Sequence, residues 1–138
     1  MSDSKVFLDT NLLVYLYSND PKSQIIEKLV SEQFEKIVIS TQVLSELYNV
    51  FIKKKIKSPE ETQQVVNDLI EAFSITILNE KTIQKAISIN HKYKFSYWDS
   101  LIISAAIDAE CTKIYTEDMQ HLQLIESRIT LINPFIHD

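Results

Sequence analysis

The stretch FSYWDSLIISAAIDAECTKIYTED, residues 95–118, decides the fold class because it joins a buried helix directly to a buried strand. At roughly 100° per residue, the helical part at 97–109 gathers apolar side chains on one broad arc. That arc comprises Trp98, Leu101, Ile102, Ile103, Ala105 and Ala106, and the opposite side holds Ser100, Ser104 and Asp108. The run KIYT at 113–116 has the apolar and β-branched character of a buried strand. A helix that leads into a buried strand is the repeating unit of an α/β fold.

The same alternation of strand and helix continues along the whole chain. Short apolar runs predict five buried strands, at 5–8, 36–39, 74–78, 113–116 and 129–132. Helices are predicted at 11–19, 21–34, 41–55, 59–73, 80–92 and 97–109, and a short turn of helix before the last strand. Capping residues mark four helix starts, at Asp20, Ser58, Asn79 and Ser96. We therefore expect one domain over residues 1–138, with three α/β/α layers around a central, mostly parallel sheet of about five strands.

The composition narrows the class of protein. The chain has 138 residues, 45% of them hydrophobic, which is enough for one core. Cys111 is the only cysteine and the N-terminus has no signal-peptide pattern, so we expect a cytoplasmic protein. No apolar stretch approaches the ~18 residues that a transmembrane helix needs, which argues against a membrane protein. The net charge of −5 argues against a surface that binds nucleic acid everywhere.

Two lysine-rich stretches are compatible with a local basic surface. They are KKKIK at 53–57 and HKYKFSYW at 91–98, and the second also carries four aromatic rings. Both stretches fit a structural interpretation, with solvated cations at helix ends and aromatic rings in the core. They equally fit a functional one, with lysines for phosphates and rings for bases.

Four carboxylates are predicted to meet at one edge of the sheet. Asp99 shares a helical row with Ile102, inside the apolar arc, so its helix should carry the carboxylate inward. Asp9 ends the first strand and Asp118 follows the fourth. Asp99 and Glu46 lie in the first two turns of helices that begin at the edge where the strands end. This edge is where α/β folds bind ligands.

Each of these carboxylates has a simple structural explanation when taken alone. Asp9, Asp99 and Asp118 could cap helices or turns, and Glu46 could be a surface charge. Together, partly buried carboxylates repel one another, and the only arginine, Arg128, is not placed near them. A hard divalent cation such as Mg²⁺ or Mn²⁺ prefers oxygen ligands and suits phosphoryl chemistry. The set therefore predicts a metal site for phosphate ester hydrolysis.

Four motifs carry a family resemblance: VFLDTNLLVYL at 6–16, SELY at 45–48, SYWDSLIISAA at 96–106 and YTEDMQH at 115–121. In this order they resemble the PIN-domain family of metal-dependent ribonucleases, and most of all the VapC-type toxins of type II toxin–antitoxin systems. The resemblance covers nearly the whole chain, from Val6 to about Pro134. It implies a PIN-like fold and an endoribonuclease that needs Mg²⁺ or Mn²⁺ to hydrolyse RNA phosphodiester bonds.

The resemblance also implies roles for the four carboxylates. Asp9 and Asp99 would be the principal metal ligands, and Asp118 would be a ligand directly or through water. Glu46 would bind the ion, or act through a water and help to orient the nucleophile.

Other residues of the motifs receive supporting roles. Asn11 and Thr116 would hold the carboxylates in place by hydrogen bonds. Glu117 is a further acid, but alternation along a strand end points it away from Asp118. His121 could reach the rim of the site or lie exposed on its turn. The predicted RNA contacts are Lys53, Lys54, Lys55, Lys92 and Lys94.

The partners that the resemblance implies are an RNA substrate, a second copy of the chain and an antitoxin. The RNA would be single-stranded or a loop, cut to leave a 5′-phosphate and a 3′-hydroxyl. The second copy would complete a homodimer, and the antitoxin would cover the acidic pocket.

Other functions use the same class of fold. A receiver domain needs an aspartate after its third strand, where this chain has Asn79. A haloacid-dehalogenase-like phosphatase needs one at position 11, which is asparagine. Two alternatives stay open: a PIN-like nuclease of RNA processing that is not a toxin, and a non-catalytic PIN scaffold that binds protein.

Overall fold

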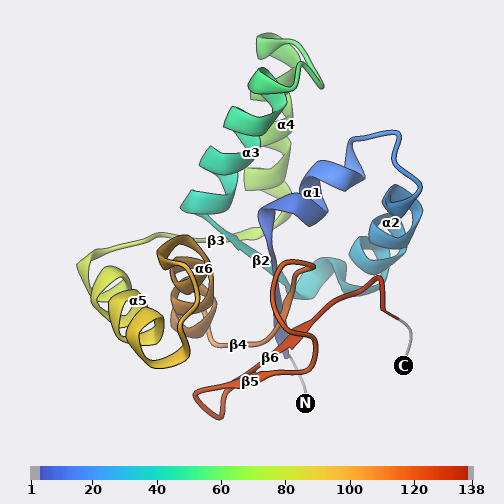
Figure 1. The fold of residues 1–138 in the computed structure, drawn as a ribbon. Helices are drawn as coiled ribbons and strands as arrows, with labels where there is room; N and C mark the ends of the chain where they lie inside the picture. The colour runs from blue at the N-terminus through green and yellow to red at the C-terminus, as the bar shows by residue number, and fades with distance from the viewer. Residues whose placement is uncertain (1–3, 137–138) are drawn as a thin grey trace.

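A six-stranded sheet forms the centre of the computed structural model, which describes residues 4–136 (Figure 1). The strands are β1 (Lys5–Leu8), β2 (Ile37–Ser40), β3 (Ser74–Thr76), β4 (Cys111–Tyr115), β5 (Leu124–Ile125) and β6 (Ile129–Ile132). Their order is β3-β2-β1-β4-β6-β5, and every neighbouring pair is parallel except β5 with β6. The predicted α/β class with a mostly parallel sheet is confirmed.

The sheet has one strand more than the sequence pattern indicated. The additional strand is β5, which has two residues and pairs with β6 in a hairpin. So short a strand has no periodicity that a sequence pattern could reveal. The predicted short turn of helix before the last strand is wrong, because residues 116–123 form bends and turns.

Six α-helices and one short 3₁₀ turn connect the strands within the described residues. They are α1 (Thr10–Leu16), α2 (Lys22–Gln33), the 3₁₀ turn η1 (Phe34–Lys36), α3 (Thr41–Lys53), α4 (Pro59–Ala72), α5 (Glu80–Tyr93) and α6 (Tyr97–Asp108). Figure 1 shows α5 and α6 on one side of the sheet and α2 on the other, while α3 and α4 stand above it. Helices α1, α3 and α6 begin at the carboxyl edge of the sheet, so their first turns surround the same space.

Side-chain caps begin α4, α5 and α6 at the predicted residues, whereas the N-cap of α2 is Pro21, one residue after the predicted Asp20. Asp20 accepts from the Lys22 backbone N–H at 2.8 Å, and Ser58 forms a reciprocal capping box at the start of α4. Asn79 caps α5, and Ser96 caps α6 through the backbone N–H of Asp99. These caps set the first turn of α6, on which Asp99 lies.

Helix α6 differs from the predicted wheel on two sides. Trp98, which was placed on the buried arc, is 62% exposed. Ser100 and Ser104, which were placed on the solvent side, are fully buried because α5 packs there. The Ser104 hydroxyl donates to the Thr82 carbonyl of α5 at 2.7 Å. Small hydroxyl side chains let two helices approach closely, so α6 is buried between the sheet and α5.

The core lies between the sheet and the helices that cover it. Phe7 and Leu8 of β1, Ile114 of β4 and Ile103 of α6 are fully buried there. Within residues 4–136, every helix is too short or too polar to cross a lipid bilayer.

Candidate active site

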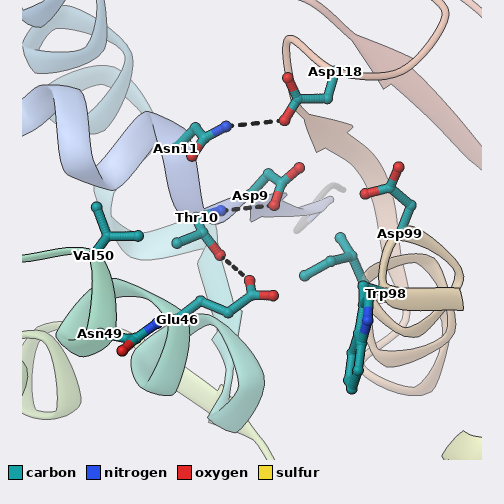
Figure 2. A pocket seen from close by; sticks show the side chains of 10 residues that line it. Asp9, Thr10, Asn11, Glu46, Asn49, Val50, Trp98, Asp99 and Asp118 are labelled. Atoms are coloured by element: carbon teal, nitrogen blue, oxygen red, sulfur yellow. Dashed lines mark hydrogen bonds between the residues drawn. The ribbon is translucent and has the colours of Figure 1, made fainter. Parts of the chain in front are cut away.

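Four elements bring the four predicted carboxylates to one pocket at the carboxyl edge of the sheet (Figure 2). Asp9 follows β1, Glu46 lies on the second turn of α3, Asp99 on the first turn of α6, and Asp118 beyond β4. The cavity measures about 290 Å³. Its lining consists of Asp9, Thr10, Asn11, Glu46, Asn49, Val50, Trp98, Asp99, Ile102 and Asp118. The lining therefore has four acidic side chains and no basic one.

Asp9 is the most buried of the four carboxylates, with 7% of its surface exposed. It is the N-cap of α1, where one carboxylate oxygen accepts from the Thr10 backbone N–H at 2.7 Å. The other accepts from the Thr116 hydroxyl at 2.8 Å. The pKa of Asp9 is raised to about 6, and burial is the largest cause. The two hydrogen bonds, from Thr116 and Thr10, act in the opposite direction, and the charges of Asp99 and Asp118 add to the rise.

Asp99 is half-buried and faces the same pocket. Burial raises the pKa of Asp99, the hydrogen bond with Ser96 lowers it, and the neighbouring charges of Asp118 and Glu46 raise it. Ile102, one turn further along α6, is buried and forms part of the pocket wall. The apolar row of α6 therefore does carry Asp99 inward, toward the pocket.

Hydrogen bonds from three elements hold the remaining two carboxylates. The Asn11 amide donates to Asp118 at 2.9 Å, and the Thr116 hydroxyl accepts from the Asp118 backbone N–H at 3.3 Å. The Thr10 hydroxyl donates to one oxygen of Glu46 at 2.6 Å, and the Gln42 amide donates to the other at 3.2 Å. Each carboxylate is thus oriented by neutral donors, and none of these contacts neutralises its charge.

The donor set fits a hard divalent cation in its chemistry. Oxygen ligands and unneutralised negative charge are what Mg²⁺ and Mn²⁺ require. The pKa of Asp9, raised by burial and by like charge, shows that the pocket disfavours its own ionised carboxylates. Within the described residues, no three acidic, histidine or cysteine side chains lie close enough together to hold an ion as they stand.

Two other motif residues lie outside the acidic pocket. Glu117 accepts a hydrogen bond from the Tyr15 hydroxyl and forms an ion pair with Lys22 at 2.9 Å. His121 is half-buried, accepts from the Asn133 backbone N–H through Nδ1 at 2.9 Å, and lines a different pocket. Neighbouring positions in the sequence therefore face different surroundings.

The five lysines predicted to contact RNA lie outside the lining of the acidic pocket. Lys53, Lys54 and Lys55 are exposed at the end of α3 that lies away from Glu46. Lys92 pairs with Glu126 at 2.7 Å, and Lys94 ends α5 in the left-handed conformation with φ 67°.

Sequence reasoning missed four polar or aromatic residues at the site. Thr10 and Gln42 orient Glu46, and Asn49 and Trp98 line the pocket beside the carboxylates. The polar run Asp9-Thr10-Asn11 after a buried strand is a signal that could have identified Thr10. The other three lie on helix faces whose neighbours only the tertiary structure defines.

A comparison with protein-family models matches residues 6–125 to the PIN domain. The chain belongs to the PIN-domain family. The matched part of this PIN domain contains all four carboxylates of the pocket. Among curated protein sequences, no significant match is found.

Solved structures similar to this PIN domain include a toxin and a toxin–antitoxin complex. A toxin–antitoxin complex from Klebsiella pneumoniae has a TM-score of 0.73 at 17% identity, covering 96% of this chain and 98% of that chain. The sarcin–ricin loop cleaving toxin VapC20 of Mycobacterium tuberculosis has a TM-score of 0.70 at 12% identity, covering 83% and 90%. FitAcB from Neisseria gonorrhoeae has a TM-score of 0.64 at 16% identity, covering 94% and 98%. At such identities, the similarity establishes the PIN fold.

Proposed function

We propose that this PIN domain is a cytoplasmic endoribonuclease that depends on Mg²⁺ or Mn²⁺ and acts as the toxin of a toxin–antitoxin pair. The observation that carries the proposal is the pocket in which Asp9, Glu46, Asp99 and Asp118 meet without a basic side chain. Membership of the PIN-domain family supports a nuclease, and the similarity to toxin structures supports the toxin role.

The proposed roles of the residues are supported by their positions in the pocket and by their hydrogen bonds. Asp9 and Asp99 would hold the cation, and Asp118 would hold it directly or through water. Asn11 and Thr116 keep Asp118 and Asp9 oriented toward the pocket. A bound cation would supply charge stabilisation to a phosphate oxygen and make a coordinated water more acidic.

Glu46 is the carboxylate best placed to orient the attacking water. Donors from Thr10 and Gln42 fix both of its oxygens, yet each oxygen keeps a second lone pair for a water. In the proposed reaction, the water oxygen bonds to phosphorus and the bond from phosphorus to the 3′ oxygen breaks. The 3′ oxygen takes up a proton, which leaves a 3′-hydroxyl and a 5′-phosphate.

The proposed partners fit the charge of the pocket. An antitoxin that inserts a basic side chain between the carboxylates would neutralise them and exclude RNA. For the RNA, we retain Lys53, Lys54, Lys55, Lys92 and Lys94 as proposed phosphate contacts, although Lys92 would have to leave Glu126. The homodimer is also part of the proposal, and the mass of the protein in solution tests it.

The test compares the parent with Asp99→Asn and uses Glu117→Gln as a matched control. Glu117 is an acid of the same region that faces Tyr15 and Lys22 instead of the pocket. Calorimetric titration of Mg²⁺ and Mn²⁺ into metal-free protein is combined with cleavage of a mixed RNA pool. We expect Asp99→Asn to lose both cation binding and cleavage, and Glu117→Gln to keep both. Undiminished cleavage by Asp99→Asn would refute the assignment of the site.

A further inference from the structure

Trp98 is a large apolar side chain that remains exposed directly beside the acidic site. It is 62% exposed although it is next in sequence to Asp99 and lines the same pocket. The indole contacts the ring of Tyr97 edge-on, with 5.2 Å between the ring centroids. Much of the indole surface is therefore accessible to a ligand.

The backbone at Trp98 is held in a fixed relation to Glu46. The amide nitrogen of Gln42 donates to the Trp98 carbonyl and to Glu46, in both cases at 3.2 Å. This bridge joins α3 to the first turn of α6 across the pocket. The indole is thus attached to a backbone position that Gln42 fixes relative to Glu46.

Trp98 and Asn49 lie on either side of Glu46 in the lining of the pocket. Figure 2 shows the indole on the α6 side and Asn49 on the α3 side, with Glu46 between them. The buried Ile102 and the half-buried Val50 add aliphatic surface to the lining. The pocket therefore combines its four carboxylates with an exposed aromatic face and aliphatic surface.

Such a pairing matches the chemistry of a nucleotide. The phosphate is drawn to the cation that the carboxylates would hold, and the base attached to it has a π-face and hydrogen-bonding edges. An exposed aromatic ring beside a phosphate site is the usual stacking platform for an unpaired base, since every base has a π-face.

We propose that Trp98 stacks on the unpaired nucleobase next to the scissile phosphate. This assignment rests on the proposed nuclease function and specifies its substrate as RNA with an unstacked base at the cleavage site. Trp98 then acts in substrate positioning, and the carboxylates act on the phosphate.

The chain contains a single tryptophan, so its fluorescence reports on Trp98 alone. By stopped-flow fluorescence, we would mix the parent protein in Mg²⁺ with short single-stranded oligoribonucleotides of one base type each, and with an abasic oligomer of the same length, and record the signal before cleavage. Stacking predicts saturable quenching by the base-containing oligomers and none by the abasic oligomer.

Cleavage kinetics supply the second measurement. Loss of one stacked base corresponds to about a 5- to 150-fold rise in KM for Trp98→Ala, with a smaller effect on kcat. Trp98→Phe should restore most of the loss. The matched control is Tyr48→Ala, which removes another exposed ring, 45% exposed, that lines a different groove, between α3 and α4. It should leave KM unchanged.

The outcomes separate this inference from the proposed function. Suppose that the parent cleaves RNA, that Trp98→Ala keeps the parental KM, and that no oligomer changes the fluorescence of Trp98. The stacking role is then wrong and the nuclease function stands. If the parent neither binds nor cleaves RNA with Mg²⁺ or Mn²⁺, the proposed function itself fails. If Trp98→Ala changes the mass of the protein in solution, and the tryptophan fluorescence of the parent depends on protein concentration and not on RNA, Trp98 is a protein contact and the inference is overturned.

Discussion

Replacing Asp9 by asparagine should stabilise the metal-free protein at neutral and alkaline pH. Asp9 is 7% exposed and its pKa is raised from 3.8 to about 6. At 1.36 kcal/mol per tenfold change in the equilibrium constant, this difference costs the folded state about 3 kcal/mol once Asp9 is ionised. Asparagine can keep the contacts with the Thr10 N–H and, through its amide, with the rotatable Thr116 hydroxyl. The substitution therefore removes mainly the charge.

The sign of the effect depends on pH. Below about pH 3.8, Asp9 is protonated in both the folded and the unfolded state and contributes nothing. Between 3.8 and about 6, the folded state binds more protons, so the free energy of unfolding of the parent falls as pH rises. We expect Asp9→Asn to gain little at pH 4 and about 3 kcal/mol at pH 8. For a chain of 138 residues, this gain is roughly 10 °C in Tm.

The assay is chemical and thermal denaturation in a chelating buffer at both pH values. Asp108→Asn is the control, for which we expect the opposite change in the free energy of unfolding at pH 8. Burial raises the pKa of Asp108, but hydrogen bonds from Lys85 and Thr82 outweigh burial and leave it lowered, so this variant should lose stability at pH 8. Added Mg²⁺ should then stabilise the parent and not Asp9→Asn. An Asp9→Asn variant whose gain is the same at pH 4 and pH 8 would falsify the reasoning.

Three further predictions concern pH dependence, the acid outside the pocket and the contact between α5 and α6. Cleavage by the parent should decline as pH falls through about 6, because protonated Asp9 cannot bind a cation. Thr116→Val removes a hydrogen bond that lowers the pKa of Asp9, so the pH–rate profile of this variant should shift to higher pH. A profile that does not move would exclude Asp9 as the titrating group. Glu117→Gln should leave the cleavage rate within about twofold and lower stability by no more than ~1 kcal/mol, since Lys22 is 40% exposed. Ser104→Ala should cost about 1 kcal/mol in urea denaturation, because the Thr82 carbonyl loses a buried donor; an unchanged midpoint would contradict that contact.

The local elements could largely be predicted from the sequence because their signals are local. Helix starts at Ser58, Asn79 and Ser96 depend on a capping side chain and an N–H two or three residues away. Strand ends were less accurate: the predicted strand 74–78 ends at Thr76, and Ile77 is 72% exposed. An apolar run predicts burial in general, but it does not show where the neighbouring strand stops.

The convergence of the carboxylates was predictable for a topological reason. Parallel strands end at one edge, and the helices that follow them begin there, so Asp9, Glu46, Asp99 and Asp118 had to approach one another. The hydrogen-bond partners of these carboxylates were harder to predict from the sequence. Asn11 and Thr116 could be expected from the motifs, but the Thr10 to Glu46 contact joins positions that are 36 residues apart.

The sequence by itself determined the order of the six α-helices and of every strand except β5, the caps of α4, α5 and α6, and the side of α6 that carries Asp99 inward, because periodicity and capping act over a few residues. Only the tertiary structure decided that Trp98 is exposed and that Ser100 and Ser104 are buried. A helical wheel divides residues by polarity, whereas burial depends on which element packs against each face. Helix α5 covers the serine side of α6, and the open side beside Asp99 leaves Trp98 facing the pocket.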